Sequence, residues 1–342
     1  MRFDEGLAFF ISAVIGAGVF ALPVLANQVS PFYVLISITI ALLFGVFLGY
    51  TILNLAPAEI EEEVERVLGK KARIVFHLFN LSIILLALTA YCLALQEHLK
   101  TSLVILLFLL FIPLFFNVTF PAAFSVSLAV FILLFLGIIS LSNLSFLETV
   151  KLSTSNIFLP PFIAAAYFAF FGHNIIPRIR NIVRNLREVK EIVLEGLLLA
   201  FLVYLPFTLS TAYLGKGEIA TILLSKIYKE PASSIIALIA VLIFYTSFIL
   251  FGLHLQDMLP PNKFNPLLIV GITSMLYWIV KRFSIGFPIL IASAGFVVCL
   301  WSLIVSIVAF KVRKGKDLLS QVSPGLTAFL STLPFILLIF YH

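Results

Sequence analysis

The chain has 342 residues, of which 62% are hydrophobic and 11% are charged, and its mean hydropathy is +1.18. Soluble domains carry roughly 25% charged residues, so this composition excludes a soluble protein and predicts a polytopic membrane protein. The formal net charge of +6 does not indicate nucleic acid, because the basic residues lie between apolar runs with no aromatic-rich soluble module around them.

The N-terminal apolar stretch is interpreted as a first membrane span rather than as a cleaved signal peptide. Residues 24–26 resemble a cleavage site, but Asp4 and Glu5 stand where a signal peptide carries positive charge. We therefore keep this segment in the membrane-spanning domain.

Apolar runs long enough to cross a bilayer recur along the whole chain, since a helix needs about 20 apolar residues to do so. The connectors "EIEEEVERVLGKKAR" and "GEIATILLSKIYK" are interpreted as amphipathic, and the acidic one as a solvated connector. Eleven transmembrane helices are predicted, the fourth of them short, over residues 5–28, 32–57, 73–97, 102–117, 121–143, 157–177, 190–214, 231–256, 264–281, 284–311 and 320–341.

The distribution of positive charge predicts the orientation in the cell membrane. Most of the 22 Lys and Arg residues fall in the loops on one side of this arrangement. Because loops rich in Lys and Arg stay in the cytoplasm, we expect a cytoplasmic N-terminus and, with an odd number of spans, an extracellular C-terminus.

Two of the predicted spans are interrupted by small residues and a proline. The first contains "IGAGVFALP" at residues 15–23, and the sixth, five spans later, contains "AFFGHNIIP" at residues 169–177. Five is an odd number, so the second unit enters the membrane from the opposite side; paired broken helices in an inverted repeat are typical of secondary transporters. We expect one transporter domain over residues 1–342, with repeats at about 3–143 and 157–312 and an extra helix at about 318–342.

The two breaks predict a site for a zwitterion held by main-chain groups, although Gly-x-Gly is also a common helix-packing surface. Unpaired backbone groups in lipid are costly unless they line a cavity. Amides that begin a half-helix favour an anion, freed carbonyls favour a cation or an ammonium group, and glycine, as at Gly16, lets a ligand approach. The candidate amides are those of Ala17, Gly18 and Val19; the candidate carbonyls are those of Ser12, Val14 and Ile15 and of Phe168, Ala169 and Phe171.

"IGAGVFALP", followed by "FAFFGHNIIPRI" in the sixth span, resembles the amino acid/auxin permease family. The shared patterns are Gly-small-Gly-hydrophobic-x-x-Leu-Pro and Phe-x-Phe-x-x-His-x-x-x-Pro. The family belongs to the amino acid–polyamine–organocation superfamily, so the resemblance implies an all-α membrane protein with the fold of the bacterial leucine transporter and a 5+5 inverted repeat. It also implies a substrate held around Val14, Ala17, Gly18, Phe168, Ala169 and Phe171, with Phe168 as an aromatic gate.

Thr246 and Ser247, side by side in "IFYTSFILF", are candidates for a sodium site, because sodium prefers several oxygens without a large charge. Such hydroxyls also commonly bond back to a carbonyl one turn earlier. The resemblance adds the carbonyls of Ser12, Ile15 and Ile243 as ligands. Residues 121–143 contain no lysine of the kind that related sodium-independent carriers use, which favours sodium.

Three polar side chains in the spans have open roles. His173, in the second break, is a candidate for proton coupling, for structural support of the break, or for substrate contact. Asn80 and Tyr91 in the third span are alternative partners for a substrate carboxylate.

No enzyme signature is present: there is no Walker loop, no His/Cys/Glu cluster with metal spacing and no intramembrane carboxylate pair. Cys92 and Cys299 lie inside apolar spans, which favours neither a disulfide framework nor a metal site. No cofactor is expected beyond a coupling ion. We expect an importer of a neutral amino acid by cation symport, with sodium preferred. The alternatives are a proton-coupled transporter or exporter that uses His173, and a non-transporting amino acid sensor on the same fold.

Overall fold

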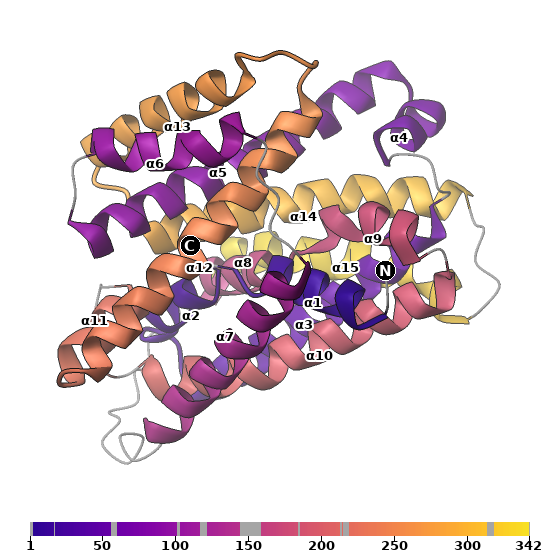
Figure 1. Cartoon of the computed structure of the whole chain (residues 1–342). Coiled ribbons are helices and arrows are strands. Elements are labelled where there is room, and N and C mark those ends of the chain that lie inside the picture. The colour runs from indigo at the N-terminus through magenta and orange to yellow at the C-terminus, as the bar shows by residue number, and fades with distance from the viewer. Residues whose placement is uncertain are drawn as a thin grey trace.

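The computed structural model describes residues 3–16, 18–55, 60–100, 103–116, 122–143, 159–183, 185–212, 214, 219–312 and 318–341, and the regular structure in these ranges is helical (Figure 1). The helices are α1 (Phe3–Val14), α2 (Gly18–Ala26), α3 (Pro31–Asn54), α4 (Ile60–Leu68), α5 (Lys70–Leu99), α6 (Leu103–Phe115), α7 (Ala122–Ser142), α8 (Leu159–Ala169), the 3-10 turn η2 (His173–Ile175), α9 (Ile176–Val183), α10 (Leu186–Thr211), α11 (Ala220–Ile227), α12 (Ala232–Met258), α13 (Asn265–Arg282), α14 (Phe287–Val312) and α15 (Leu318–Tyr341).

The helices follow the predicted spans in order, and the chain is a multi-pass membrane protein. Within the described residues, seven segments are long and apolar enough to cross a membrane: α1 with α2, α3, α5, α10, α12, α14 and α15. Shorter apolar helices in the same described ranges lie within α6, α7 and α8. The 13 residues of α6 rise only about 20 Å, in agreement with the short fourth span.

Two groups of helices make up the body of the protein. In one, α1 and α3 pack along α10, while α2 and α3 pack against α8; in the other, α5 packs along α12, and α13 packs against α5 and α6. Helix α14 joins the groups because it packs along both α5 and α8, and α15 covers α3 and α14.

A small residue allows the closest of these helix contacts. A Cβ on Gly295 of α14 would lie 1.8 Å from the carbonyl oxygen of Ala164 in α8. Large apolar side chains such as Ile138, Leu202 and Phe329 are instead exposed on the surface, as lipid-facing residues are. Close contact through small residues is the usual way for membrane helices to associate.

The two predicted amphipathic connectors form short helices at opposite ends of the molecule. Helix α4 directly precedes α5, and α11 directly precedes α12. The last residue of α12, Met258, lies at the α4 end, so α12 runs from the α11 end to the α4 end (Figure 1). The prediction that the acidic connector is solvated is wrong for Glu63. This side chain is buried, because α4 packs against α5 and α14, and it pairs with Arg66.

Candidate functional site

The two predicted interruptions are present as helix breaks. Helix α1 ends at Val14 and α2 begins at Gly18, while α8 ends at Ala169 and η2 begins only at His173. Ala17, a predicted ligand, lies outside the described residues. Pro23 lies inside α2, so the helix continues past the proline and the break comes before it.

The two breaks are in direct contact with each other. A Cβ on Gly18 would lie 2.8 Å from the Cα of Ala169, and a Cβ on Gly172 would lie 3.3 Å from the backbone nitrogen of Val14. A larger residue at Gly18 would have to move backbone, and one at Gly172 would also collide with Cγ2 of Val14, 2.6 Å away. Segments about 155 residues apart in the sequence therefore form one site.

A single tyrosine joins the C-terminal ends of both half-helices. The Tyr204 hydroxyl, from α10, donates to the carbonyl of Val14 at 2.7 Å and lies 3.3 Å from the carbonyl of Ala169. Tyr204 is fully buried. Tyr204 was not among the predicted site residues, although a tyrosine inside an otherwise apolar span is a signal of a buried hydrogen bond.

Several of the predicted carbonyl ligands also accept bonds within the breaks. The carbonyl of Val14 accepts from the Gly16 amide at 2.8 Å, and the carbonyl of Phe168 accepts from the Phe171 amide at 2.9 Å. The carbonyl of Phe168 keeps a second lone pair that can face a ligand, whereas the carbonyl of Val14 already accepts from both Tyr204 and Gly16. Gly18 and Val19 are the first residues of α2, where amides have no partner one turn earlier.

Hydroxyl groups of α5 and α12 approach the first break. A Cβ on Gly16 would lie 3.3 Å from Oγ of Ser247 and 3.6 Å from the hydroxyl of Tyr91. Of the two candidates for a carboxylate partner, Tyr91 therefore lies at the break. Asn80 lies elsewhere and donates to the sulfur of Met258 at 3.6 Å.

Polar groups of Thr246, Ser12 and Ile15 form hydrogen bonds with nearby residues of their own segments. The Thr246 hydroxyl lies 2.8 Å from the carbonyl of Leu242 and 3.1 Å from that of Ile243, and the Ser12 hydroxyl donates to the carbonyl of Ala8. The amide of Ile15 donates to the carbonyl of Ile11 at 2.7 Å. The Thr246 hydroxyl donates its proton and keeps its lone pairs, so its oxygen can still act as a ligand. The ligands predicted at Ser12, Ile15 and Ile243 are carbonyl oxygens, and that of Ile243 lies 3.1 Å from the Thr246 hydroxyl.

Aromatic rings flank the second break. Phe168 is buried, with its ring centroid 6.4 Å from that of Phe251 on α12. Phe171 meets Trp301 of α14 edge to face, with the centroids 5.3 Å apart.

His173 ties the second break to α3. Its Nε2 lies 2.7 Å from the carbonyl oxygen of Gly45. A carbonyl only accepts, so Nε2 carries the proton and, in the neutral ring, Nδ1 is an acceptor. This Nδ1 has no hydrogen-bond partner in the described part of the chain, and the rings of Phe10 and Phe171 lie nearby.

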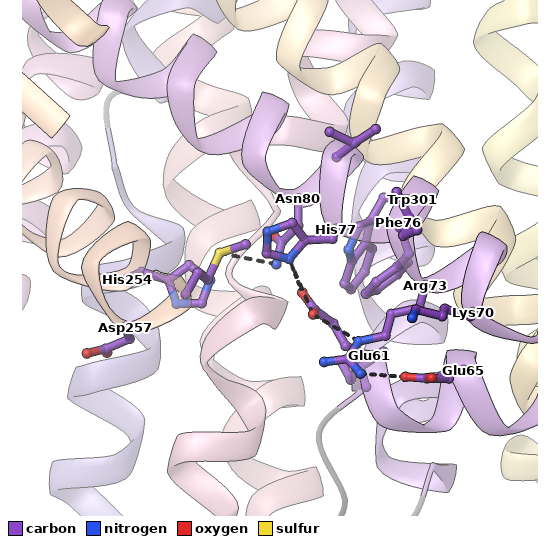
Figure 2. A pocket seen from close by; sticks show the side chains of 14 residues that line it. Glu61, Glu65, Lys70, Arg73, Phe76, His77, Asn80, His254, Asp257 and Trp301 are labelled. Carbon is purple, nitrogen blue, oxygen red and sulfur yellow. Dashed lines mark hydrogen bonds and ion pairs between the residues drawn. The ribbon is translucent and has the colours of Figure 1, made fainter. Parts of the chain in front are cut away.

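A cavity of about 610 Å³ opens between α4, α5, α12 and α14. Figure 2 shows Trp301 and Phe76 on one side and His254 and Asp257 on the other. The cavity is walled by Ile60, Glu61, Glu65, Lys70, Arg73, Ile74, Phe76, His77, Leu78, Asn80, His254, Asp257, Met258 and Trp301.

No protein-family model and no curated protein sequence matches this chain. Solved structures do. The manganese transporter of Eremococcus coleocola, in complex with an aromatic bis-isothiourea substituted compound, superposes with a TM-score of 0.67 at 11% identity, covering 99% of this chain and 86% of that one. Mhp1, a nucleobase-cation-symport-1 family transporter in a closed conformation with bromovinylhydantoin bound, superposes with a TM-score of 0.57 at 13% identity, covering 99% of this chain and 91% of that one.

This chain has the fold of the bacterial leucine transporter. The expected fold class, with its two broken helices, is therefore confirmed. Likeness at such low identity shows the fold alone, so the amino acid/auxin permease family, the count of eleven transmembrane helices and the repeat boundaries stay predictions.

Proposed function

We propose that this chain is a secondary transporter that imports a neutral amino acid together with a cation, with its N-terminus in the cytoplasm and its C-terminus outside. One observation carries the proposal: the two helix breaks touch each other at Gly18 and Gly172, and the hydroxyls of Ser247 and Tyr91 approach the same place at Gly16. Main-chain donors and acceptors thus converge with hydroxyls at membrane depth, as in transporters that bind substrate between broken helices.

The chemistry of the breaks favours a zwitterion without a charged side chain. Residues 15–23 and 168–172 contain no acidic or basic side chain. The first amides of α2 and the hydroxyl of Tyr91 suit a carboxylate. The carbonyls of Phe168 and Ala169, each with a lone pair left beside the bond it accepts, suit an ammonium group.

A divalent metal ion as substrate fits this chain poorly. Manganese prefers carboxylate, carbonyl and water oxygens, and the two breaks contain no carboxylate, thiol or thioether. Within the described residues, no group of three or more His, Cys, Asp or Glu side chains could hold a metal ion. The likeness to the manganese transporter therefore does not extend to its cargo.

Sodium is the proposed coupling ion, with the hydroxyls of Thr246 and Ser247 and the carbonyls of Ser12, Ile15 and Ile243 as ligands. Ser247 supports this proposal because its oxygen lies beside the first break. The remaining lone pairs of Thr246 are free to contribute.

A two-step experiment tests the function. A thermal-shift screen of the twenty amino acids, with sodium or with choline, identifies the ligand, and uptake of that amino acid into proteoliposomes follows. We expect a neutral amino acid to stabilise the protein and to accumulate only with a sodium gradient. Undiminished accumulation in choline at fixed pH would exclude sodium, and binding without concentrative uptake would indicate a sensor.

Proton coupling through His173 is the second candidate, favoured by its buried Nδ1, which has no hydrogen-bond partner among the residues that the structure describes. His173→Gln keeps an N–H for the carbonyl of Gly45 and removes the titratable ring. If protons drive transport, this variant retains amino acid binding and loses accumulation driven by a pH gradient. If His173 is structural, both are retained.

A further inference from the structure

The cavity at the α4 end is separated from the second helix break by one aromatic side chain. Trp301 stacks on Phe76 on the cavity side, with centroids 5.2 Å apart, and meets Phe171 of the break on its other side. Both Phe76 and Trp301 line the cavity. A molecule in the cavity and a molecule at the break would thus be neighbours.

Trp301 brings an unused hydrogen-bond donor to this wall. Its side chain is only 2% exposed, and its Nε1 has no hydrogen-bond partner among the described residues. Nearly all buried N–H groups in proteins have an acceptor. A ligand oxygen in the cavity would supply one.

The other walls carry both signs of charge. Glu61 pairs with His77 at 3.0 Å, and Arg73 pairs with Glu65. The remaining ionisable lining residues are Lys70, His254 and Asp257. Walls of mixed sign suit a zwitterion better than a simple anion or cation, because each end of the molecule finds an opposite charge.

We propose that this cavity is a second binding site for the transported amino acid. It lies on the cytoplasmic side of the helix breaks, where an importer releases its substrate. The ligand carboxylate accepts from Nε1 of Trp301, its ammonium group faces the acidic side chains, and its apolar side chain rests on Phe76 and Met258. The volume of about 610 Å³ lies in the range of small-molecule sites, about 300–1,000 Å³. The identity of the ligand rests on the proposed function.

Tryptophan fluorescence tests the proposal directly, because the chain contains two tryptophans. Trp278 on α13 is 63% exposed and lies outside the cavity lining, so Trp278→Phe leaves Trp301 as the sole reporter. Neutral amino acids, beginning with L-leucine and L-alanine, are titrated while Trp301 emission is recorded. We expect a saturable change in emission with the amino acid that stabilises the protein in the thermal-shift screen.

A matched pair of variants in the same background assigns the signal to the cavity. Asn80→Phe fills the cavity, whereas Leu81→Phe adds the same ring at a neighbouring position of α5 that does not line it. The emission change should disappear in the first and persist in the second. His254→Phe fills the cavity from α12 and serves if Asn80→Phe does not fold.

The outcomes separate the two proposals. An emission change that is the same in the cavity-filling variant and in Leu81→Phe overturns the second site, because the signal then comes from the break. A thermal shift without any change in Trp301 emission also overturns it and leaves the proposed function standing. If no amino acid stabilises the protein or changes Trp301 emission, both proposals fail.

Discussion

The α11 end and the α4 end of the molecule are lined by different kinds of side chain. At the α11 end, Phe244 of α12 packs against Phe20 of α2 and Phe287 of α14, at centroid distances of 5.3 and 5.7 Å. Phe20 also meets Phe207 of α10 at 6.0 Å. At the α4 end, the same helix α12 borders a cavity lined by ionisable groups.

Among the described residues, aromatic rings thus meet towards α11, whereas a cavity opens towards α4. Rings in contact are held by dispersion and apolar burial, which are lost only when whole side chains separate. The ion pairs between α4 and α5 are partly exposed, and such pairs contribute about 0–1 kcal/mol each. We therefore expect the α11 end to be much harder to open than the α4 end.

Phe244→Ala should have the largest effect, because its ring contacts those of Phe20, Phe287 and His98, which together form the aromatic cluster at the α11 end. Deleting a buried phenylalanine costs about 3–5 kcal/mol. We expect a lower unfolding temperature in lipid nanodiscs and faster hydrogen exchange in α11. Phe329→Ala, at an exposed position of α15, is the control. Equal losses of stability would contradict the idea that the aromatic cluster holds this end closed.

Tyr204→Phe tests the middle of the molecule, where the two ends meet at the breaks. It removes the hydroxyl near the carbonyls of Val14 and Ala169. The Val14 carbonyl keeps its bond from Gly16, so we expect a loss of about 0.5–1.5 kcal/mol, the net contribution of a typical hydrogen bond. Amide exchange should therefore accelerate in both breaks together. The control is Tyr167→Phe, which removes a hydroxyl that donates to the carbonyl of Leu330 on α15. Faster exchange at one break alone would show that Tyr204 does not couple them.

The sequence predicted the two breaks and their partnership but not the residue that joins them. Small residues and a proline interrupt an apolar run locally, so "IGAGVFALP" and "AFFGHNIIP" could be recognised along the chain. The bond from Tyr204 to Val14 spans 190 positions, and no local pattern encodes such a pairing. Ser247 was identified from its hydroxyl, yet its position beside Gly16 depends on how α12 packs against α1.

The cavity was not predicted for the same reason. Its walls come from α4, α5, α12 and α14, and each side chain is unremarkable in its own segment. The acidic connector looked solvated because its composition is polar. Burial of Glu63 follows from the packing of α4 against α5 and α14, which composition does not report.

Arg73→Gln should have the smallest effect and concerns the α4 end. Arg73 pairs with Glu65 of α4, and its side chain is 45% exposed. Screening by salt weakens such a pair, so hydrogen exchange in α4 should rise by a few-fold at low salt. The difference from wild type should vanish in about 1 M NaCl, where the screening length is about 3 Å. Arg187→Gln removes an exposed pair with Glu191 inside α10 and should leave α4 unchanged. If the rise in exchange persists at high salt, Arg73 holds α4 by packing rather than by charge. Both ends would then be held by packing, which contradicts the expected difference between them.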